Sequence, residues 1–180
     1  MIPNAEKCIS LMNTYGMLAN IKEHSLKVEH VARIIAEGIK KCGINISLEK
    51  VTAGALMHDI AKTMCLGSTA DHAKRGEEIC LENKFFEIAE IVGEHIQLKS
   101  FKPESEVTEK EIIYYADKRV NNNEVVTLEK RLEYLIDRYA KNEKALIQRI
   151  EDNFRRCREV EKKIFSNLDF SPEDLIELAK

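Results

Sequence analysis

The chain has 180 residues, of which 44% are hydrophobic and 33% charged, and this is the composition of a folded globular protein. The formal net charge of -3 gives no general attraction to nucleic acid, and no apolar run approaches the length of a bilayer. Five scattered cysteines without a CxxC pair, and an N-terminus (MIPNAEKCIS) without the apolar core of a signal peptide, predict a cytoplasmic protein with reduced thiols.

The residue types predict a protein built of helices. Seven glycines and three prolines leave few chain breakers, while Glu, Lys, Leu, Ile and Ala are abundant. In the first half of the chain, apolar residues recur at helical spacing between polar caps and glycines. The interior of the third expected helix, TAGALM, uses small residues and indicates close approach by a neighbouring helix. We expect helices here over residues 4–15, 21–42, 47–59, 71–83 and 85–95.

The second half continues the helical pattern after a polar loop over residues 97–107. A long segment from Ile147 to Ile164 has apolar residues at three- and four-residue steps, which predicts an amphipathic helix. No strand alternation, internal repeat or low-complexity tract is visible. The signals for helix starts are a capping box formed by Thr108 and Glu111, a cap at Thr127, and Ser171 followed by Pro172.

Histidines and aspartates on separate helices suggest a metal site. The pair His58-Asp59, in the segment LMHDIAK, can offer a nitrogen and an oxygen ligand to one ion. Asp117 lies on an otherwise apolar helix, where a carboxylate is costly to bury unless a cation pairs with it. His30 follows His24 by six residues and is turned off its face, so we expect a structural or exposed residue there. The further candidates, each in or at the start of its own predicted helix, are His24, His72, His95 and Asp117.

Five segments in chain order resemble the HD-domain superfamily of metal-dependent phosphohydrolases. HSLKVEHVARIIAEGI resembles its first helix, and ALMHDIAK resembles the signature of its HDIG-type members. DHAKRGEEI and AEIVGEH resemble the segments that carry two further histidines in the two-metal members, and ADKR resembles the final aspartate motif. The resemblance covers residues 20–136. It implies an all-α fold, with an HD-type helical bundle core and a C-terminal helical extension.

The resemblance also implies a ligand set. His24, His58, Asp59 and Asp117 would bind one metal ion; His72 and His95 would bind a second, with Asp59 as the bridge. Iron is the first expectation for one or both divalent ions, and manganese, cobalt, nickel and zinc suit the same ligand types. The chain departs from many relatives at Ala61, where they carry glycine. It also lacks the long GYP-type signature, which argues against cyclic-di-GMP phosphodiesterase activity.

For activity, the resemblance implies hydrolysis of a phosphoester or phosphoanhydride bond in a nucleotide-like substrate by a metal-bound hydroxide. We expect Asp59 and Lys62 to be catalytic, and Lys62 and Arg119 to bind the substrate phosphate. The alternative for Lys62 is a helix C-terminal cation that interacts with the dipole, and for Arg119 a surface ion pair of little energy. Lys74 and Arg75, which follow His72, are expected to be solvated.

We divide the chain into an HD-type domain over residues 1–140 and a helical extension over residues 141–180. The stripe from Ile147 to Ile164 is expected to pack on the core, with a homodimer contact as the alternative. The basic cluster Arg155, Arg156 and Arg158 is diluted by neighbouring acidic residues and is read as a solvated face, so a nucleic-acid partner is not expected. The expected partner is a nucleotide or another phosphorylated small molecule, and we expect no association with a membrane.

Two other classes of function remain open at this stage. The domain could bind metal and nucleotide as a regulatory module without significant turnover, although an intact ligand set argues against lost catalysis. It could also be a helical adaptor that works through the segment after about residue 141. The first predicts tight binding without product, and the second predicts loss of partner binding when that segment is removed.

Overall fold

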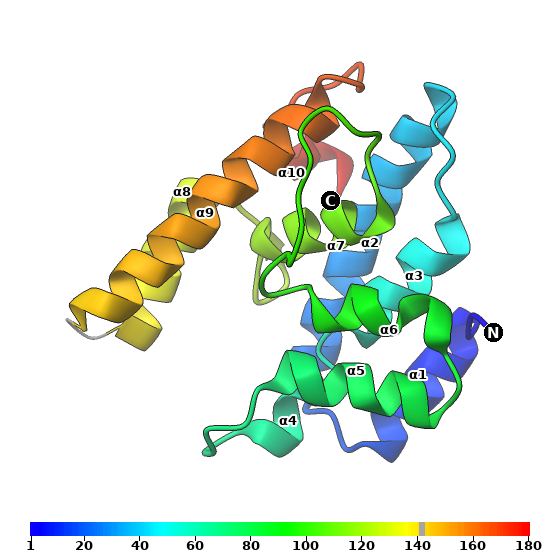
Figure 1. Ribbon diagram of the computed structural model, residues 1–180, viewed down its shortest axis with the longest axis vertical. Helices are drawn as coiled ribbons and strands as arrows, with labels where there is room; N and C mark the ends of the chain where they lie inside the picture. The colour runs from blue at the N-terminus through cyan, green and yellow to red at the C-terminus, as the bar shows by residue number, and fades with distance from the viewer. Residues whose placement is uncertain (141–142) are drawn as a thin grey trace.

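The computed structural model describes residues 1–140 and 143–180, and almost all regular structure in these residues is helical (Figure 1). The all-α fold expected from the sequence is confirmed. Among the described helices, none is long and apolar enough to cross a membrane. A π-helical turn, η1, covers Ile136–Ala140. The α-helices are α1 Ala5–Thr14, α2 Ala19–Lys41, α3 Leu48–Met57, α4 Lys62–Cys65, α5 His72–Glu82, α6 Phe86–Gly93, α7 Glu109–Lys118, α8 Leu128–Leu135, α9 Lys144–Phe165 and α10 Leu175–Leu178.

Polar side chains cap half of the described α-helices, and the caps predicted at Ser47, Thr108 and Thr127 are present. The full capping box forms at α7, where the Thr108 N–H donates to Glu111 Oε2 at 3.0 Å. The last predicted start is wrong. Residues 171–174 form a turn, closed by the Asp174 carboxylate accepting from the Ser171 N–H at 2.8 Å, and α10 begins only at Leu175.

A short antiparallel hairpin after α7 was not expected from the sequence. Strand β1, Val120–Asn121, pairs with β2, Glu124–Val125, with Val120 opposite Val125. The turn holds Asn122 at a φ of 55°, in the left-handed region that asparagine tolerates better than most residues. Strands of two residues are too short to show an alternating pattern. The turn matters because it brings the Asn122 carbonyl to His24.

The core lies where α3 packs against α2, α6 and α7. Gly54 permits the close approach, because a Cβ added there would lie 2.7 Å from side-chain atoms of both Ile91 and Ile113. The contact predicted from the small residues of TAGALM is therefore confirmed. It brings the C-terminal ends of α3 and α6 to the last turn of α7, and the candidate ligands lie at this junction.

The C-terminal helix α9 packs on α7 and α8 through one apolar face. The buried apolar residues of this face are Phe154, Cys157, Val160 and Ile164. The Tyr114 hydroxyl on α7 donates to the backbone oxygen of Asn153 at 2.8 Å. In Figure 1, α9 is the long orange helix that projects beyond the core, with α8 beside its outer end. The apolar stripe thus contacts helices of its own chain, whereas the expected domain boundary at residue 141 lies outside the described residues.

Candidate metal centre

Five side chains, from segments spread between residues 24 and 117, meet around Asp59. The structure brings together every metal ligand that the sequence suggested. Asp59, His58 and His95 are each no more than 2% exposed, while His72 is half-buried at the side facing a cavity. The residues are His24 from α2, His58 and Asp59 directly after α3, His72 at the start of α5, His95 after α6, and Asp117 from α7.

The end of α3 explains how Asp59 comes to lie at the centre. The helix stops at Met57, and the next hydrogen bonds are tighter turns, from Ile60 N–H to Met57 O at 3.0 Å and from Lys62 N–H to Asp59 O at 2.9 Å. Ile60 and Ala61, which follow Asp59 in this turn, are fully buried, and the Asp59 side chain is itself held inside the protein at 1% exposure. A carboxylate buried this deeply requires compensating positive charge.

The two oxygens of Asp59 face two different groups of imidazoles. Oδ2 lies 3.4 Å from His58 Nε2 and 3.9 Å from His24 Nε2. Oδ1 lies 3.2 Å from His72 Nε2 and 3.5 Å from His95 Nε2. The ligand atoms within each group lie within 4.8 Å of one another. Such groups can each hold one divalent ion, with Asp59 shared between them.

Asp117 completes the first group from the opposite side. Its Oδ1 lies 3.0 Å from His24 Nε2 and 3.7 Å from His58 Nε2. Cis ligands about 2.1 Å from one metal ion are separated by roughly 3 to 3.5 Å, so the 3.0 Å spacing matches a shared coordination sphere and the 3.7 Å spacing lies just above this range. A cluster of histidine and aspartate compatible with a divalent metal is therefore present where the sequence expected it.

Backbone carbonyls fix the orientation of three of the imidazoles. His58 Nδ1 lies 2.7 Å from the Ala55 oxygen, and His95 Nδ1 lies 2.7 Å from the Val92 oxygen. His24 Nδ1 lies 3.0 Å from the oxygen of Asn122. A carbonyl accepts only, so Nδ1 carries the proton in each ring and Nε2 presents its lone pair to the cluster. Metal-binding histidines are commonly oriented in this way.

In this arrangement the lone pairs of the imidazole Nε2 atoms face those of the carboxylate oxygens. Whether these acceptors have partners tests whether the residues fit a metal ion. Neutral imidazole Nε2 atoms and carboxylate oxygens repel each other unless a proton or cation lies between them. Among the described residues, His58 Nε2 and Asp59 Oδ1 are buried with no hydrogen-bond partner. Buried orphan acceptors at the centre of such a cluster are satisfied by a cation, and the donor set therefore fits divalent metal ions.

The pKa shifts of these groups also indicate that the buried carboxylates attract positive charge. Burial alone would raise the pKa of Asp59, but His58 and Lys62 hold it well below its usual range. Burial would lower the pKa of His58, yet the carboxylates of Asp59 and Asp117 raise it above the ordinary value. Burial lowers the pKa of His95 to about 4, which keeps its ring neutral. The two carboxylates thus favour positive charge at His58, whereas the neutral ring of His95 keeps a lone pair for a cation.

Two lysines lie directly against the carboxylates. Lys62 Nζ donates to Asp59 Oδ2 at 2.8 Å and lines the adjoining cavity. Lys118 Nζ, which is buried, donates to the His95 carbonyl at 2.8 Å and lies 3.4 Å from Asp117 Oδ2. Lys62 is thus placed to meet an anion at the cluster, whereas Lys118 ties the His95 backbone to Asp117.

Arg119 does not have the role that the sequence predicted. Its guanidinium is buried and donates to the backbone oxygens of Val126 at 2.6 Å and Pro172 at 2.8 Å, with a further bond to the Tyr115 hydroxyl. Val126 directly follows the hairpin and Pro172 lies in the C-terminal turn, whereas Tyr115 is on α7 itself. As the residue that ends α7, Arg119 faces away from Asp117 and stabilises the extension, so the expected phosphate contact is corrected. His30 lies outside the cluster, near Arg33 Nη2 at 3.4 Å.

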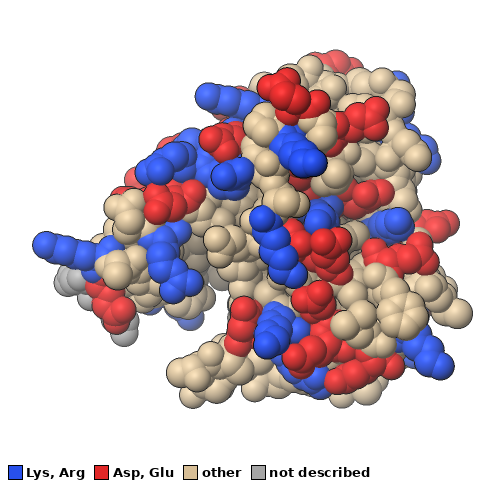
Figure 2. Space-filling view, in the orientation of Figure 1, with Lys and Arg blue, Asp and Glu red and all other residues tan. Residues whose placement is uncertain are grey.

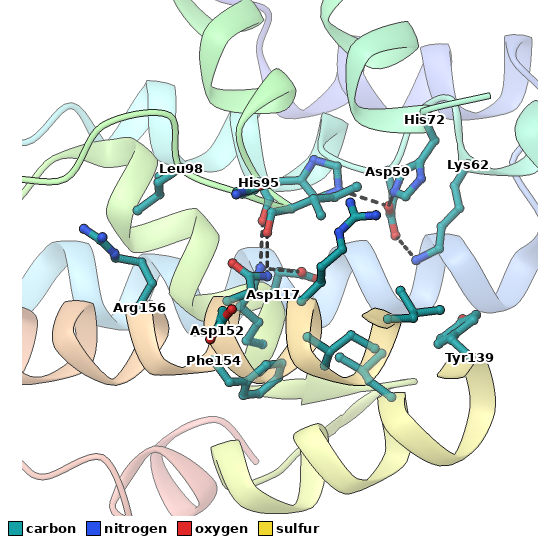
Figure 3. A pocket seen from close by; sticks show the side chains of 18 of the residues that line it. Asp59, Lys62, His72, His95, Leu98, Asp117, Tyr139, Asp152, Phe154 and Arg156 are labelled. Carbon is teal, nitrogen blue, oxygen red and sulfur yellow. Dashed lines mark hydrogen bonds and ion pairs between the residues drawn. The ribbon is translucent and has the colours of Figure 1, made fainter. Parts of the chain in front are cut away.

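A cavity of about 1100 Å³ opens beside the cluster. Asp59, His72, His95 and Asp117 lie at its inner wall, and α8, η1 and α9 supply the opposite wall (Figure 3). Figure 3 shows α9 running beneath the cluster, with Tyr139 below Lys62. In the space-filling view, the surface is notched between the outer end of α9 and the loop after α4 (Figure 2). The extension is therefore part of the site.

Sequence reasoning missed several groups that shape this site. It did not expect Lys118 to tether the His95 backbone or the Asn122 carbonyl to orient His24, and it named no residue of α8 or α9 as lining a cavity. Two signals were available. Ala55 and Val92 each precede a histidine by three residues near a helix end, which is the spacing of the Nδ1–H bonds. The run of asparagines at 121–123 is typical of a turn.

Fold and site together define an all-α protein with a buried histidine–aspartate centre able to hold divalent metal. A comparison with known families matches residues 21–142 to the HD domain, and the chain belongs to that family. The resemblance noted in the sequence is thereby confirmed. The HD domain points to the superfamily of metal-dependent phosphohydrolases. No solved structure matches the chain.

Two curated relatives are similar over about half of the chain. A tRNA (cytidine(56)-2'-O)-methyltransferase of Thermoplasma volcanium is 36% identical over 97 residues, which are 53% of this chain and 27% of that protein. An uncharacterized protein of Methanocaldococcus jannaschii is 33% identical over 89 residues, 49% of this chain and 51% of that protein. The matches thus span about a quarter and about half of these relatives, so their names do not define the activity of this chain.

Proposed function

We propose that the protein is a metal-dependent phosphohydrolase that cleaves a phosphoester or phosphoanhydride bond of a nucleotide-like substrate. The observation that carries this proposal is the position of Asp59 between two groups of imidazoles, one at each carboxylate oxygen. A shared carboxylate is the arrangement that holds two cations close together. Iron is the first candidate metal, with manganese, cobalt, nickel and zinc as alternatives.

The residues of this chain support the chemistry in three ways. His24, His58, Asp59 and Asp117 would hold one divalent ion, and His72 and His95 with Asp59 would hold the other. When bound, such ions supply an activated water and offset the charge of the phosphoryl group. Lys62, at the cavity side of Asp59, would contact a phosphate oxygen there. The buried ligands hold their geometry before substrate arrives, which lowers the cost of organising the site.

The cavity supports a substrate larger than inorganic phosphate. Its volume of about 1100 Å³ is at the upper end of small-molecule sites. Lysines at 62, 99 and 102 line it and favour an anionic compound. Apolar and aromatic residues, among them Leu135, Tyr139 and Phe154, offer surface to a base or another organic group. One relative is named for a reaction on a cytidine of tRNA, which adds cytidine compounds to the substrates to be tested.

The test is metal analysis together with hydrolysis assays on protein purified without chelators. We expect up to two divalent ions per chain and release of phosphate from members of a nucleotide panel. Asp59→Ala should lose both metals and turnover, while His72→Ala should lose one metal and keep the other. Asp169→Asn and His30→Ala, which change residues outside the cluster, are the matched controls.

Unchanged turnover in Asp59→Ala would overturn the assignment. Tight nucleotide binding without product under iron, manganese, cobalt or nickel would instead support a regulatory module. Absence of metal from freshly purified protein, and failure to take up any of these ions, would remove the basis for both functions.

A further inference from the structure

The arginines of this protein fall into two groups. Six of the nine lie within 4 Å of a carboxylate oxygen in the described residues. Arg131 and Arg149 have no such partner there, and both line the large cavity. Arg138 also lacks one but lies at a separate surface hollow. The six paired residues are Arg33, Arg75, Arg119, Arg155, Arg156 and Arg158.

Arg131, on α8, is a buried cation without a counter-charge. It is 8% exposed, and the hydrogen bond it forms is from Nη1 to the neutral amide oxygen of Asn121 at 2.9 Å. Its Nε is buried and has no partner among the described residues. The guanidinium carbon lies 5.6 Å from the centre of the Tyr134 ring, a weak favourable contact. An arginine buried in this way is costly unless an anion reaches it.

Arg149 adds a second free cation from the neighbouring helix. It is exposed and lies at the cavity face of α9. The later arginines of the same helix are neutralised: Arg155 pairs with Asp152 at 3.1 Å and Arg158 with Glu129 at 3.6 Å. Asp152 and Arg156 also line the cavity, and Arg156 pairs with Glu159 at 3.4 Å, so within the described residues Arg149 is the cavity-lining arginine of α9 that lacks a carboxylate within 4 Å.

These arginines are separate from the groups that face the metal centre. Lys62 on α4 and Lys118 on α7 already contact Asp59 and Asp117. The two arginines come from α8 and α9, which form the opposite wall of the same cavity (Figure 3). A planar guanidinium binds phosphate through two parallel hydrogen bonds, which an ammonium group cannot do.

We propose that Arg131 and Arg149 form a second anion subsite, so that the substrate carries two phosphate groups. One phosphate lies at the metal centre and is cleaved, and the other is held by the arginines on the wall formed by α8 and α9. This rests on the proposed function and deepens it, by naming a nucleoside diphosphate or bisphosphate, in preference to a monophosphate, as the substrate class.

The experiment compares the binding of AMP, ADP and adenosine 3′,5′-bisphosphate by calorimetry to the protein as purified. We expect at least one two-phosphate compound to bind about 10-fold to 100-fold more tightly than AMP, because its second phosphate would accept charged hydrogen bonds from the arginines. Arg149→Gln and Arg131→Lys should each reduce this preference by about 10-fold. Arg155→Gln, on the same helix but paired with Asp152, should retain it.

Arg149→Gln keeps the test valid if the buried Arg131 variant fails to fold. Equal weakening of AMP and of both two-phosphate compounds, no effect in either variant, or no preference in the unmodified protein would overturn the inference. Because the readout is binding, it is independent of turnover. A protein that binds two-phosphate compounds through these arginines but hydrolyses none would refute the proposed function and leave the subsite standing.

Discussion

Lys118 Nζ donates a hydrogen bond to the backbone oxygen of His95 at 2.8 Å and lies 3.4 Å from Asp117 Oδ2. The lysine is buried, and its ammonium group lies 4.0 Å from the centre of the Tyr114 ring. Burial lowers its pKa, although Asp117 opposes this. The Lys118 ammonium group thus connects the segment after α6, which carries His95, with helix α7, which carries Asp117.

Lys118→Met should therefore weaken metal binding without removing a ligand. The His95 backbone loses its tether and Asp117 loses its neighbouring cation, and changes of this kind cost about 10-fold to 100-fold in metal affinity. Calorimetric titration of Mn²⁺ into chelator-stripped protein measures this, with the exposed Lys40→Met as control. Unaltered affinity in Lys118→Met would mean that the lysine serves packing alone.

The ligands could be predicted from the sequence because each depends on a local motif. His58-Asp59 at the end of a small-residue helix, and Asp117 in an apolar one, signal buried carboxylates that need a cation. The order of these motifs then made the family recognisable. Helix caps could be predicted for the same reason, because the capping box of Thr108 and Glu111 depends on four consecutive residues.

The remaining features depend on contacts between distant segments. Arg119 follows a ligand directly, and adjacency suggested a phosphate contact, but the turn that ends α7 points it at Val126 and Pro172. Likewise, the cavity wall formed by α8 and α9 has no motif of its own. Whether Arg131 is paired with a carboxylate depends on tertiary packing, which helical periodicity does not encode.

A buried ion pair fastens the extension to α7 and should contribute strongly to stability. Lys163 Nζ lies 2.8 Å from Glu111 Oε1 and also donates to the Lys102 oxygen at 3.0 Å. Lys163→Met leaves Glu111 buried without its cation, so we expect a loss of about 3 to 5 kcal/mol in the free energy of unfolding. Urea denaturation followed by circular dichroism measures it.

The adjacent Lys162→Met is a matched control, because that side chain is exposed on the same helix. It should change stability by less than about 0.5 kcal/mol. The double variant Lys163→Met/Glu111→Gln removes both charges and should recover part of the loss. Equal stability of the Lys163 and Lys162 variants would show that the ion pair contributes nothing.

The five cysteines should differ strongly in their reactivity toward an alkylating reagent. Burial raises the pKa of Cys8 to about 11 and that of Cys80 and Cys157 to about 12, and only the thiolate reacts quickly. Cys42 is exposed. At pH 8, iodoacetamide followed by mass spectrometry should label Cys42 first, half-buried Cys65 more slowly, and the other three only after denaturation. Early labelling of Cys157 would contradict its burial on the packed face of α9.

The same thiols should make the fold sensitive to alkali. Their folded-state pKa values lie above the ordinary value of 9.0, so between about pH 9 and 12 the native state keeps protons that the unfolded chain loses. The free energy of unfolding should therefore fall as pH rises through this window. Cys157→Ala should show a shallower fall than the unmodified protein, whereas Cys42→Ala should follow the unmodified curve.

Close helix contact at Gly54 links the packing of the core to the position of the metal ligands. An added methyl group at this residue would meet Ile91 on α6 and Ile113 on α7, each at 2.7 Å. Alanine gains up to about 1 kcal/mol of helix propensity over glycine, but overpacking costs about 1 to 3 kcal/mol, so Gly54→Ala should be net destabilising. Gly54→Val should be worse. Because His58 and Asp59 follow directly after α3, only four and five residues from Gly54, a shift of this helix would move them. Both variants should therefore also bind Mn²⁺ less tightly. Gly54→Ala with higher stability and unchanged metal affinity would show that α3 can shift without disturbing the centre.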